Sequence, residues 1–300
     1  MTKYFGSMGF WGRGFTLIFL TMAGMLISAG SAQISAYYIY GQENLVHPTI
    51  PVLQYMHAIL SIGTFVVPPI LLVILCCNTT LSEGLCINKA PKWKTIVLSI
   101  FLMLVSQPFV EYLTDLNLNL VLPDSLKPIE NWMREKEASA QEMTQKLLSS
   151  PSAIVFAINI GVMALLPAIG EELYFRVTLQ KLIITDKTRI GAIASALITA
   201  FIFSAIHLQF FGFLPRFVLG AALGLILAFS GNVWNCIAAH FANNALAIIS
   251  SYIKATSQTV SIPAYLESTW MIILSALLSI ITFFMIYKTE KIEKKICKSN

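Results

Sequence analysis

The sequence predicts an all-α membrane protein, a polytopic bundle of about eight transmembrane helices. Hydrophobic residues make up 56% of the 300 residues and charged residues only 12%, whereas soluble domains carry roughly 25% charged residues. The mean hydropathy is +0.73, and apolar runs long enough to cross a bilayer recur along the chain. So few charges cannot cover a water-soluble surface, so most of the chain must face lipid.

Eight apolar segments approach the length of about 20 residues that a span requires. In chain order they are 15–40, 52–76, 95–113, 152–180, 190–207, 217–230, 233–252 and 266–287. The fourth is too long to cross perpendicularly and contains Pro167, which predicts a tilted or kinked helix. The first follows Arg13 as a signal peptide would, but its apolar run continues to Tyr40, which favours an uncleaved anchor.

The distribution of basic residues predicts how these spans are oriented in the membrane. If the chain starts in the cytosol, thirteen of the 20 Lys and Arg residues fall in cytosolic segments and six in outer ones, while Arg176 lies inside a span. The positive-inside rule therefore predicts that both termini are cytosolic. We expect a prokaryotic plasma membrane, because the chain is compact and carries no eukaryotic sorting signal.

One long polar stretch, 114–150, separates the third and fourth spans. Its second half places apolar side chains at roughly helical spacing: Ile129, Trp132, Met133, Ala140, Met143 and Leu147. Glu130 and other charged residues fall elsewhere, so we expect an amphipathic helix on the membrane or over the outer mouth of the bundle. A surface connector is the simpler interpretation, and a lid or substrate gate is the alternative.

Composition and cysteine spacing also argue against nucleic-acid binding, a disulfide framework and a cysteine metal site. No basic patch interleaved with aromatic residues supports nucleic-acid binding. Five cysteines, two of them adjacent, form neither a disulfide framework nor a CxxC metal pair.

The informative residues are the polar ones inside spans, because a charged side chain at mid-bilayer costs about 2.5–3.5 kcal/mol on insertion scales. Three apolar segments contain them in short clusters. These clusters are Glu171, Glu172 and Arg176; Phe203 and His207; and His240, Asn243 and Asn244. Each cluster alone reads as a packing device or interhelical hydrogen bonding. Together, within one short stretch, they are a costly way to join helices, which favours a functional site.

Helical spacing shows what each cluster can do. Glu172 and Arg176 lie one turn apart and can pair, while Glu171 sits about 100° around the helix from Glu172, so that its carboxylate can point toward a cavity. The same spacing lets His240 and Asn244 donate hydrogen bonds to one shared oxygen. Two acids, two imidazoles and an amide on three helices make a hydrolytic set. Gly220 and the glycine four residues later permit close helix contact beside it.

The ordered motifs Glu-Glu-x-x-x-Arg, Phe-x-x-x-His and His-x-x-x-Asn on successive apolar helices resemble the CPBP family of intramembrane glutamic endopeptidases. These are CAAX-processing and bacteriocin-processing proteases related to the Ras-converting CAAX endopeptidase. The resemblance implies a catalytic core at 151–252, after an N-terminal membrane region, 1–150, that carries no matching motif. The last span and a basic cytosolic tail occupy 253–300.

The resemblance also assigns roles. Glu171 and His207 would activate water, and His240 and Asn244 would form the oxyanion hole, with Asn243 as the alternative amide. Glu172, Arg176 and Phe203 would support the site. No cofactor is implied; a zinc site built from the acids and imidazoles is the alternative, although an amide is a poor zinc ligand.

The expected substrate is a peptide or protein, membrane-anchored or prenylated in some members of such a family. A non-catalytic scaffold or immunity-type binding protein of the same fold is the second hypothesis. A proton-coupled transporter is the third, and the absence of an inverted repeat in the sequence argues against it. Counted along the expected spans, Glu171, His207 and His240 lie at different depths, so their convergence requires tilting, a broken helix or shifted boundaries.

Overall fold

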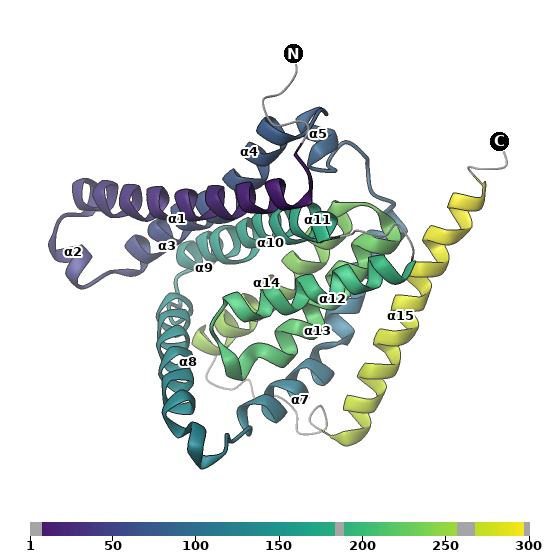
Figure 1. Ribbon diagram of the computed structural model, residues 1–300. Coiled ribbons are helices and arrows are strands. Elements are labelled where there is room, and N and C mark those ends of the chain that lie inside the picture. The colour runs from purple at the N-terminus through teal and green to yellow at the C-terminus, as the bar shows by residue number, and fades with distance from the viewer. Residues whose placement is uncertain (1–7, 184–188, 257–267, 297–300) are drawn as a thin grey trace.

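The computed structural model describes residues 8–183, 189–256 and 268–296, and within those ranges it contains helices and no strand (Figure 1). The start of the last predicted span, 266–267, and the end of the basic tail lie outside them. The N-terminal half comprises α1 (Phe10–Tyr40), α2 (Glu43–Val46), α3 (Ile50–Ser61), the π-helix η1 (Ile62–Val66), α4 (Val67–Cys76), α5 (Leu81–Gly84), α6 (Trp93–Val105), α7 (Gln107–Leu118), the 3₁₀ turn η2 (Asp124–Leu126) and α8 (Lys127–Leu148).

The second half contains the polar clusters. Its elements are α9 (Ala153–Asn159), the π-helix η3 (Ile160–Leu165), α10 (Leu166–Glu171), the π-helix η4 (Glu172–Gln180), α11 (Lys181–Ile183), α12 (Arg189–Ile206), the 3₁₀ turn η5 (Phe210–Gly212), α13 (Phe213–Ser230), α14 (Val233–Thr256) and α15 (Thr269–Ile296).

Candidate membrane spans confirm the predicted fold class. Six helical segments of the described chain are long and apolar enough to cross a bilayer: Phe10–Tyr40, Ile50–Cys76, Ala153–Ile183, Phe210–Ser230, Val233–Thr256 and Thr269–Glu290. The bent pair α6 and α7 makes a seventh, and α12 is a shorter apolar helix. The protein is therefore an all-helical integral membrane protein, and eight spans is an approximate count.

The third predicted span is broken. The chain bends by 44° between α6 and α7, at Ser106. Pro108 stands at the start of α7, where it has no N–H to donate to a carbonyl of the preceding turn. The apolar run hides this break, and α7 continues to Leu118, beyond the expected end of the span.

The fourth span carries the predicted irregularity around Pro167. A π-helical segment precedes this proline and another begins at Glu172, so only the short α10 between them is α-helical. The hydroxyl of Thr178 donates to the carbonyl of Leu173, five residues earlier, at 2.9 Å. Such π segments are rare and concentrate at functional sites.

Two buried clusters hold the helices that carry the polar motifs in place. One joins α6, α13, α14 and α15 through residues such as Met103, Ile226 and Ile286. The other joins α4, α10, η4 and α14 through residues such as Ala168 and Ile237. Both clusters include α14, so the helix that carries His240 is fixed from two sides.

Helix α8 lies across the ends of the bundle helices and crosswise to α1 (Figure 1). Its Trp132 ring lies 5.3 Å from that of Phe210 in η5, and the Arg134 guanidinium lies 4.4 Å from the Phe211 ring. Ile129 and Met143, from the predicted apolar face, remain about half exposed (49% each). The amphipathic helix therefore covers η5 and leaves apolar side chains for lipid.

One charged residue of α8 is not on its polar face as the pattern predicted. Glu130 is only 1% exposed. It accepts hydrogen bonds from Nε of Arg134 at 2.8 Å, Nζ of Lys127 at 3.3 Å and the N–H of Leu122 at 3.3 Å. The bond from Arg134 is the main cause that lowers the pKa of Glu130, and burial opposes it. Full hydrogen bonding is what allows this carboxylate to be buried.

Candidate active site

The double glutamate stands at the junction of two helix types. Glu171 is the last residue of α10, and the π-helix η4 begins at Glu172. The two carboxylates therefore leave the backbone in different directions. The side chain of Glu172 is fully buried, whereas that of Glu171 keeps 13% of its surface exposed.

Glu172 is held by two basic side chains. Its Oε2 lies 3.2 Å from Nε of Arg176, and its Oε1 lies 2.8 Å from Nδ1 of His240. Arg176 also donates from Nη2 to the carbonyl of Gly220 at 3.1 Å. Its guanidinium stands 4.9 Å from the Phe203 ring. This network ties η4, α12, α13 and α14 together inside the bundle.

The glycine pair on α13 makes room for this network. A Cβ at Gly224 would come within 2.9 Å of Cβ of Ala196 and 3.0 Å of Oε1 of Gln180. Gln180 donates to the carbonyl of Gly224 at 2.9 Å, as Arg176 does to that of Gly220. The close contact predicted from the Gly-x-x-x-Gly spacing is present. It also exposes two carbonyls to long side chains of η4.

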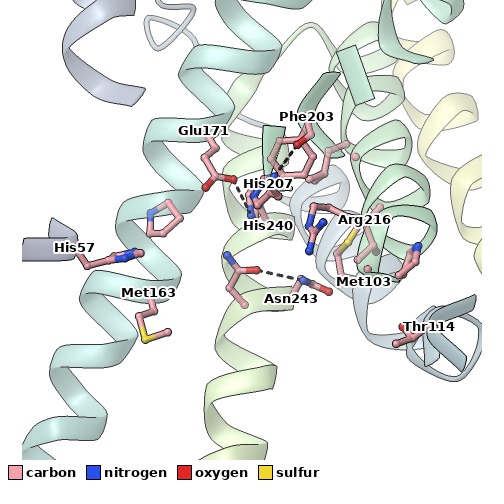
Figure 2. Close-up of a pocket in the computed structure, with 17 residues that line it drawn as sticks. His57, Met103, Thr114, Met163, Glu171, Phe203, His207, Arg216, His240 and Asn243 are labelled. Atoms are coloured by element: carbon pink, nitrogen blue, oxygen red, sulfur yellow. Dashed lines mark hydrogen bonds and ion pairs between the residues drawn. The ribbon is translucent and has the colours of Figure 1, made fainter. Parts of the chain in front are cut away.

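Glu171 faces the other edge of the same imidazole. Its Oε2 lies 3.8 Å from Nε2 of His240, and Figure 2 shows the carboxylate directed at that ring. His240 thus stands between two carboxylates, hydrogen-bonded to Glu172 and separated from Glu171 by more than hydrogen-bond distance.

His207 follows the end of α12 and is fixed by its own helix. Its Nδ1 lies 2.7 Å from the carbonyl oxygen of Phe203, and the two rings meet edge-on at 4.9 Å. A carbonyl only accepts, so Nδ1 must carry the proton, and in the neutral ring Nε2 has a free lone pair. His207 therefore offers an acceptor, not a donor, from its second nitrogen.

A series of side-chain amides joined by hydrogen bonds, here called the amide relay, fixes the orientation of the Asn244 side chain. Nε2 of Gln107 donates to the Met103 carbonyl at 2.7 Å and to Oδ1 of Asn243 at 3.2 Å. Nδ2 of Asn243 then donates to Oδ1 of Asn244 at 3.2 Å, the bond drawn in Figure 2. Both asparagines use the side-chain oxygen as acceptor, so Asn244 keeps its Nδ2 group for another partner.

These groups share one cavity of about 450 Å³. Glu171, Phe203, His207, His240 and Asn244 all line it, so the structure brings the predicted site residues together from three helices; the buried pair Glu172 and Arg176 lies behind its wall. The expected difference in depth disappears in the folded bundle, where the fourth span is irregular and His207 lies just past the end of α12.

The cavity also contains residues that the sequence did not single out for this site. Arg216 and His57 line it (Figure 2), and Gln107 reaches it through Asn243, the predicted alternative amide. The side chain of His57 is exposed at the cavity edge. For Arg216, the only feature of the sequence that could have indicated a place in the site is its charge close to the end of a predicted span.

The arrangement has a limited capacity for metal ions. Among the described residues, no group of three His, Cys, Asp or Glu side chains is placed to hold one ion. Both oxygens of Glu172 already face Arg176 and His240. What the cavity presents instead is a carboxylate, an imidazole acceptor and an amide donor within apolar walls.

The fold and the cavity define an integral membrane protein whose polar groups gather inside the bundle. Residues 153–246 match the family model described as Rce1-like, type II CAAX prenyl endopeptidase. The match runs from the start of α9 into α14 and includes every motif from Glu171 to Asn244. It confirms the family resemblance and supports a protease function for this segment. Comparisons with curated proteins and with solved structures gave no match.

Proposed function

We propose that the chain is an intramembrane endopeptidase that hydrolyses peptide bonds with a water molecule activated by Glu171 and His207. One observation carries the proposal: a carboxylate, an acceptor imidazole, a second imidazole and an amide converge on one cavity inside the bundle. Amide hydrolysis requires a base for water, donors for the oxyanion and a proton for the leaving amine.

In the first step the ionised Glu171 accepts a proton from water as the water oxygen bonds to the scissile carbonyl carbon. The lone pair on Nε2 of His207 accepts a hydrogen bond from the other O–H and orients the attack. The carbonyl π electrons move to the oxygen, and Nδ2–H of Asn244 donates to the resulting oxyanion. Apolar walls strengthen these interactions, because the local dielectric constant is low.

His240 is the second donor to the oxyanion. Its Nδ1–H is committed to Glu172, so Nε2 can donate only when both ring nitrogens carry protons. Glu172 and Glu171 supply negative charge on either side of that imidazolium. Glu172 thus acts as a positioning residue that fixes the orientation of the ring.

In the second step the tetrahedral intermediate collapses. The carbonyl re-forms, the C–N bond breaks, and the proton held by Glu171 moves to the leaving amine. The products are one peptide with a new carboxylic acid and one with a new amine, and transfer of the acid proton to the amine gives the carboxylate and the ammonium group. Glu171 returns to its ionised form, so the cycle consumes only water.

The family description points to the substrate class. We infer that the preferred substrate is a membrane-anchored peptide, with a prenylated CAAX sequence as the first to test. Cleavage of a farnesylated peptide that ends in Cys-Val-Ile-Ser would be compared with cleavage of the same peptide without the lipid. The topology that we infer places both termini in the cytosol of a prokaryotic cell.

The test is peptide cleavage by purified protein, before and after chelator treatment, with metal content measured in parallel. We expect cleavage to survive chelation and Glu171→Gln to remove nearly all of it. Stoichiometric zinc, with activity lost on chelation and restored by metal, would replace this mechanism with a metalloprotease one. Absence of cleavage by folded wild-type protein with every peptide would favour the non-catalytic binding protein.

A further inference from the structure

Arg216 is a cation held in the wall of the cavity. It belongs to the first turn of α13 and is half-buried. Nη2 donates to Oε1 of Gln209 at 2.7 Å, and Nη1 donates to the backbone carbonyl of the same residue at 3.3 Å. Gly212 leaves room for the guanidinium, because a Cβ there would come within 3.0 Å of Nη2. The loop after His207 therefore fixes where this charge lies.

No carboxylate in the described part of the chain forms an ion pair with Arg216. Among the described residues, none places a carboxylate oxygen within 4.0 Å of Arg216, whereas Arg176 and Arg134 each pair with a glutamate. The nearby acids are engaged elsewhere: Oε2 of Glu137 accepts from the N–H of Phe211 at 3.2 Å, and Glu171 faces His240. A guanidinium has five N–H donors, and Gln209 uses only two of them.

An arginine set into a membrane bundle without an acidic partner is costly and marks a functional position. Figure 2 shows Arg216 on the side of His240 away from Glu171, with the Asn243 amide close by. A peptide whose scissile bond lies at Glu171 would therefore extend toward Arg216 along the cavity. The unused N–H groups suit a carboxylate, which an arginine fork binds through two parallel hydrogen bonds.

We propose that Arg216, positioned by Gln209, binds a carboxylate of the peptide substrate and so selects its cleavage register. This inference rests on the proposed function, because it names a subsite of that cavity. The carboxylate has two sources, the free C-terminus of the peptide or an acidic side chain near the cleaved bond. Both sources present the same carboxylate group to the guanidinium, and synthetic peptides that carry only one of the two carboxylates distinguish them.

The experiment measures binding without turnover, in full-length protein that carries Glu171→Gln. Three labelled, farnesylated peptides are compared: one ending in Cys-Val-Ile-Ser with a free carboxylate, its C-terminal carboxamide, and a carboxamide in which Asp replaces the last Ser. The free acid should bind roughly 10–100-fold more tightly than the plain amide, as expected for a charge-assisted hydrogen bond. Tight binding of the Asp amide instead would assign the subsite to an acidic side chain.

Variants at position 216 test the assignment. Adding Arg216→Gln should remove the preference for the acid, and Arg216→Lys should keep part of it, because the charge remains but the fork is lost. Lys254→Gln, an exposed cation near the end of α14, is the matched control and should leave the preference intact.

Equal affinity for all three peptides, or an equal loss for all three in Arg216→Gln, would overturn the proposal. The first result would mean that no carboxylate is recognised, and the second that Arg216 only shapes the cavity or holds the charge of Glu171. Neither result depends on cleavage, so a failed cleavage assay and a failed carboxylate site are distinguishable.

Discussion

Glu172 holds the imidazole of His240 by a hydrogen bond of 2.8 Å between Oε1 and Nδ1. The same carboxylate pairs with Arg176, so one fully buried acid links a structural cation to a ring that lines the cavity. This arrangement separates two adjacent glutamates by environment. Glu172 is enclosed and Glu171 is partly open to the cavity. We therefore expect mutations at the two positions to have different effects on stability.

Removing the positive partner of Glu172 should destabilise the bundle. Arg176→Leu leaves a buried carboxylate with only His240 beside it and abandons the Gly220 carbonyl, and breaking a buried pair costs about 3–5 kcal/mol. Thermal unfolding in detergent should show a clearly lower midpoint. Glu171→Gln keeps the shape of its side chain and should leave the midpoint nearly unchanged. Equal losses in the two variants would show that the two glutamates do not divide structure and chemistry in this way.

The contact between α12 and α13 should be sensitive to a single methyl group. Gly224→Ala forces a Cβ against Ala196 and Gln180, and overpacking of this kind costs about 1–3 kcal/mol. Gly30→Ala is the matched control, since no heavy atom lies within 4 Å of a Cβ there and alanine favours the helix. Lower stability in the first variant with no loss in the second is the expected result. A loss shared by both would point to helix propensity instead of packing.

Helix α8 should contribute a pH-dependent part of the stability. The hydrogen bond from Arg134 lowers the pKa of Glu130 below its usual value, which is about 4.3 in an unfolded chain. The stabilisation is therefore fully present above that pH and disappears as the pH falls through the lower folded-state value. Unfolding midpoints of wild type and Glu130→Gln should differ at pH 6 and converge toward pH 3. Glu142→Gln, an exposed control on the same helix, should show no such convergence.

The sequence predicted what depends on composition and on local spacing. Apolar runs predicted the spans, Pro167 predicted the irregular fourth span, and the i,i+4 pairs predicted that polar side chains share helix faces. The break at Ser106 was missed because hydropathy continues through it. Burial of Glu130 was missed because it depends on three donors that meet only in the folded chain.

Long-range contacts limited the prediction of the site in the same way. Asn243 and Gln107 are separated by 136 residues in the chain, so no local pattern shows that one orients the other. The same holds for His240 and Glu172, 68 residues apart. Motif order predicted that these helices meet, but not which nitrogen of His240 faces which carboxylate.

Both termini are expected to lie on the cytosolic side and α8 on the outer side. A cysteine introduced at Ser139, which is exposed on α8, should react with an impermeant maleimide added to intact cells after the native cysteines are replaced. Ser82→Cys, exposed on α5, is the control and should react only after the membrane is opened. Labelling with the reverse pattern would invert the topology that the basic residues indicate.

The amide relay predicts a graded loss of turnover along its members. Nδ2 of Asn244 is the proposed donor to the oxyanion, so Asn244→Ala should lower kcat by about 10²–10³ with little change in KM. Asn243 only fixes the direction of that amide through a hydrogen bond of 3.2 Å. Asn243→Ala should therefore cost roughly 2–10-fold, the usual contribution of one neutral hydrogen bond.

Gln107→Ala should have a similar small effect, and the double variant with Asn243→Ala should lose less than the sum of the two, because both act on one amide. Unfolding midpoints of all four variants report whether a loss of turnover is structural. If Asn243→Ala lowers kcat as much as Asn244→Ala does, then Asn243 supplies the donor, and the relay runs in the opposite direction from the one that these hydrogen bonds describe.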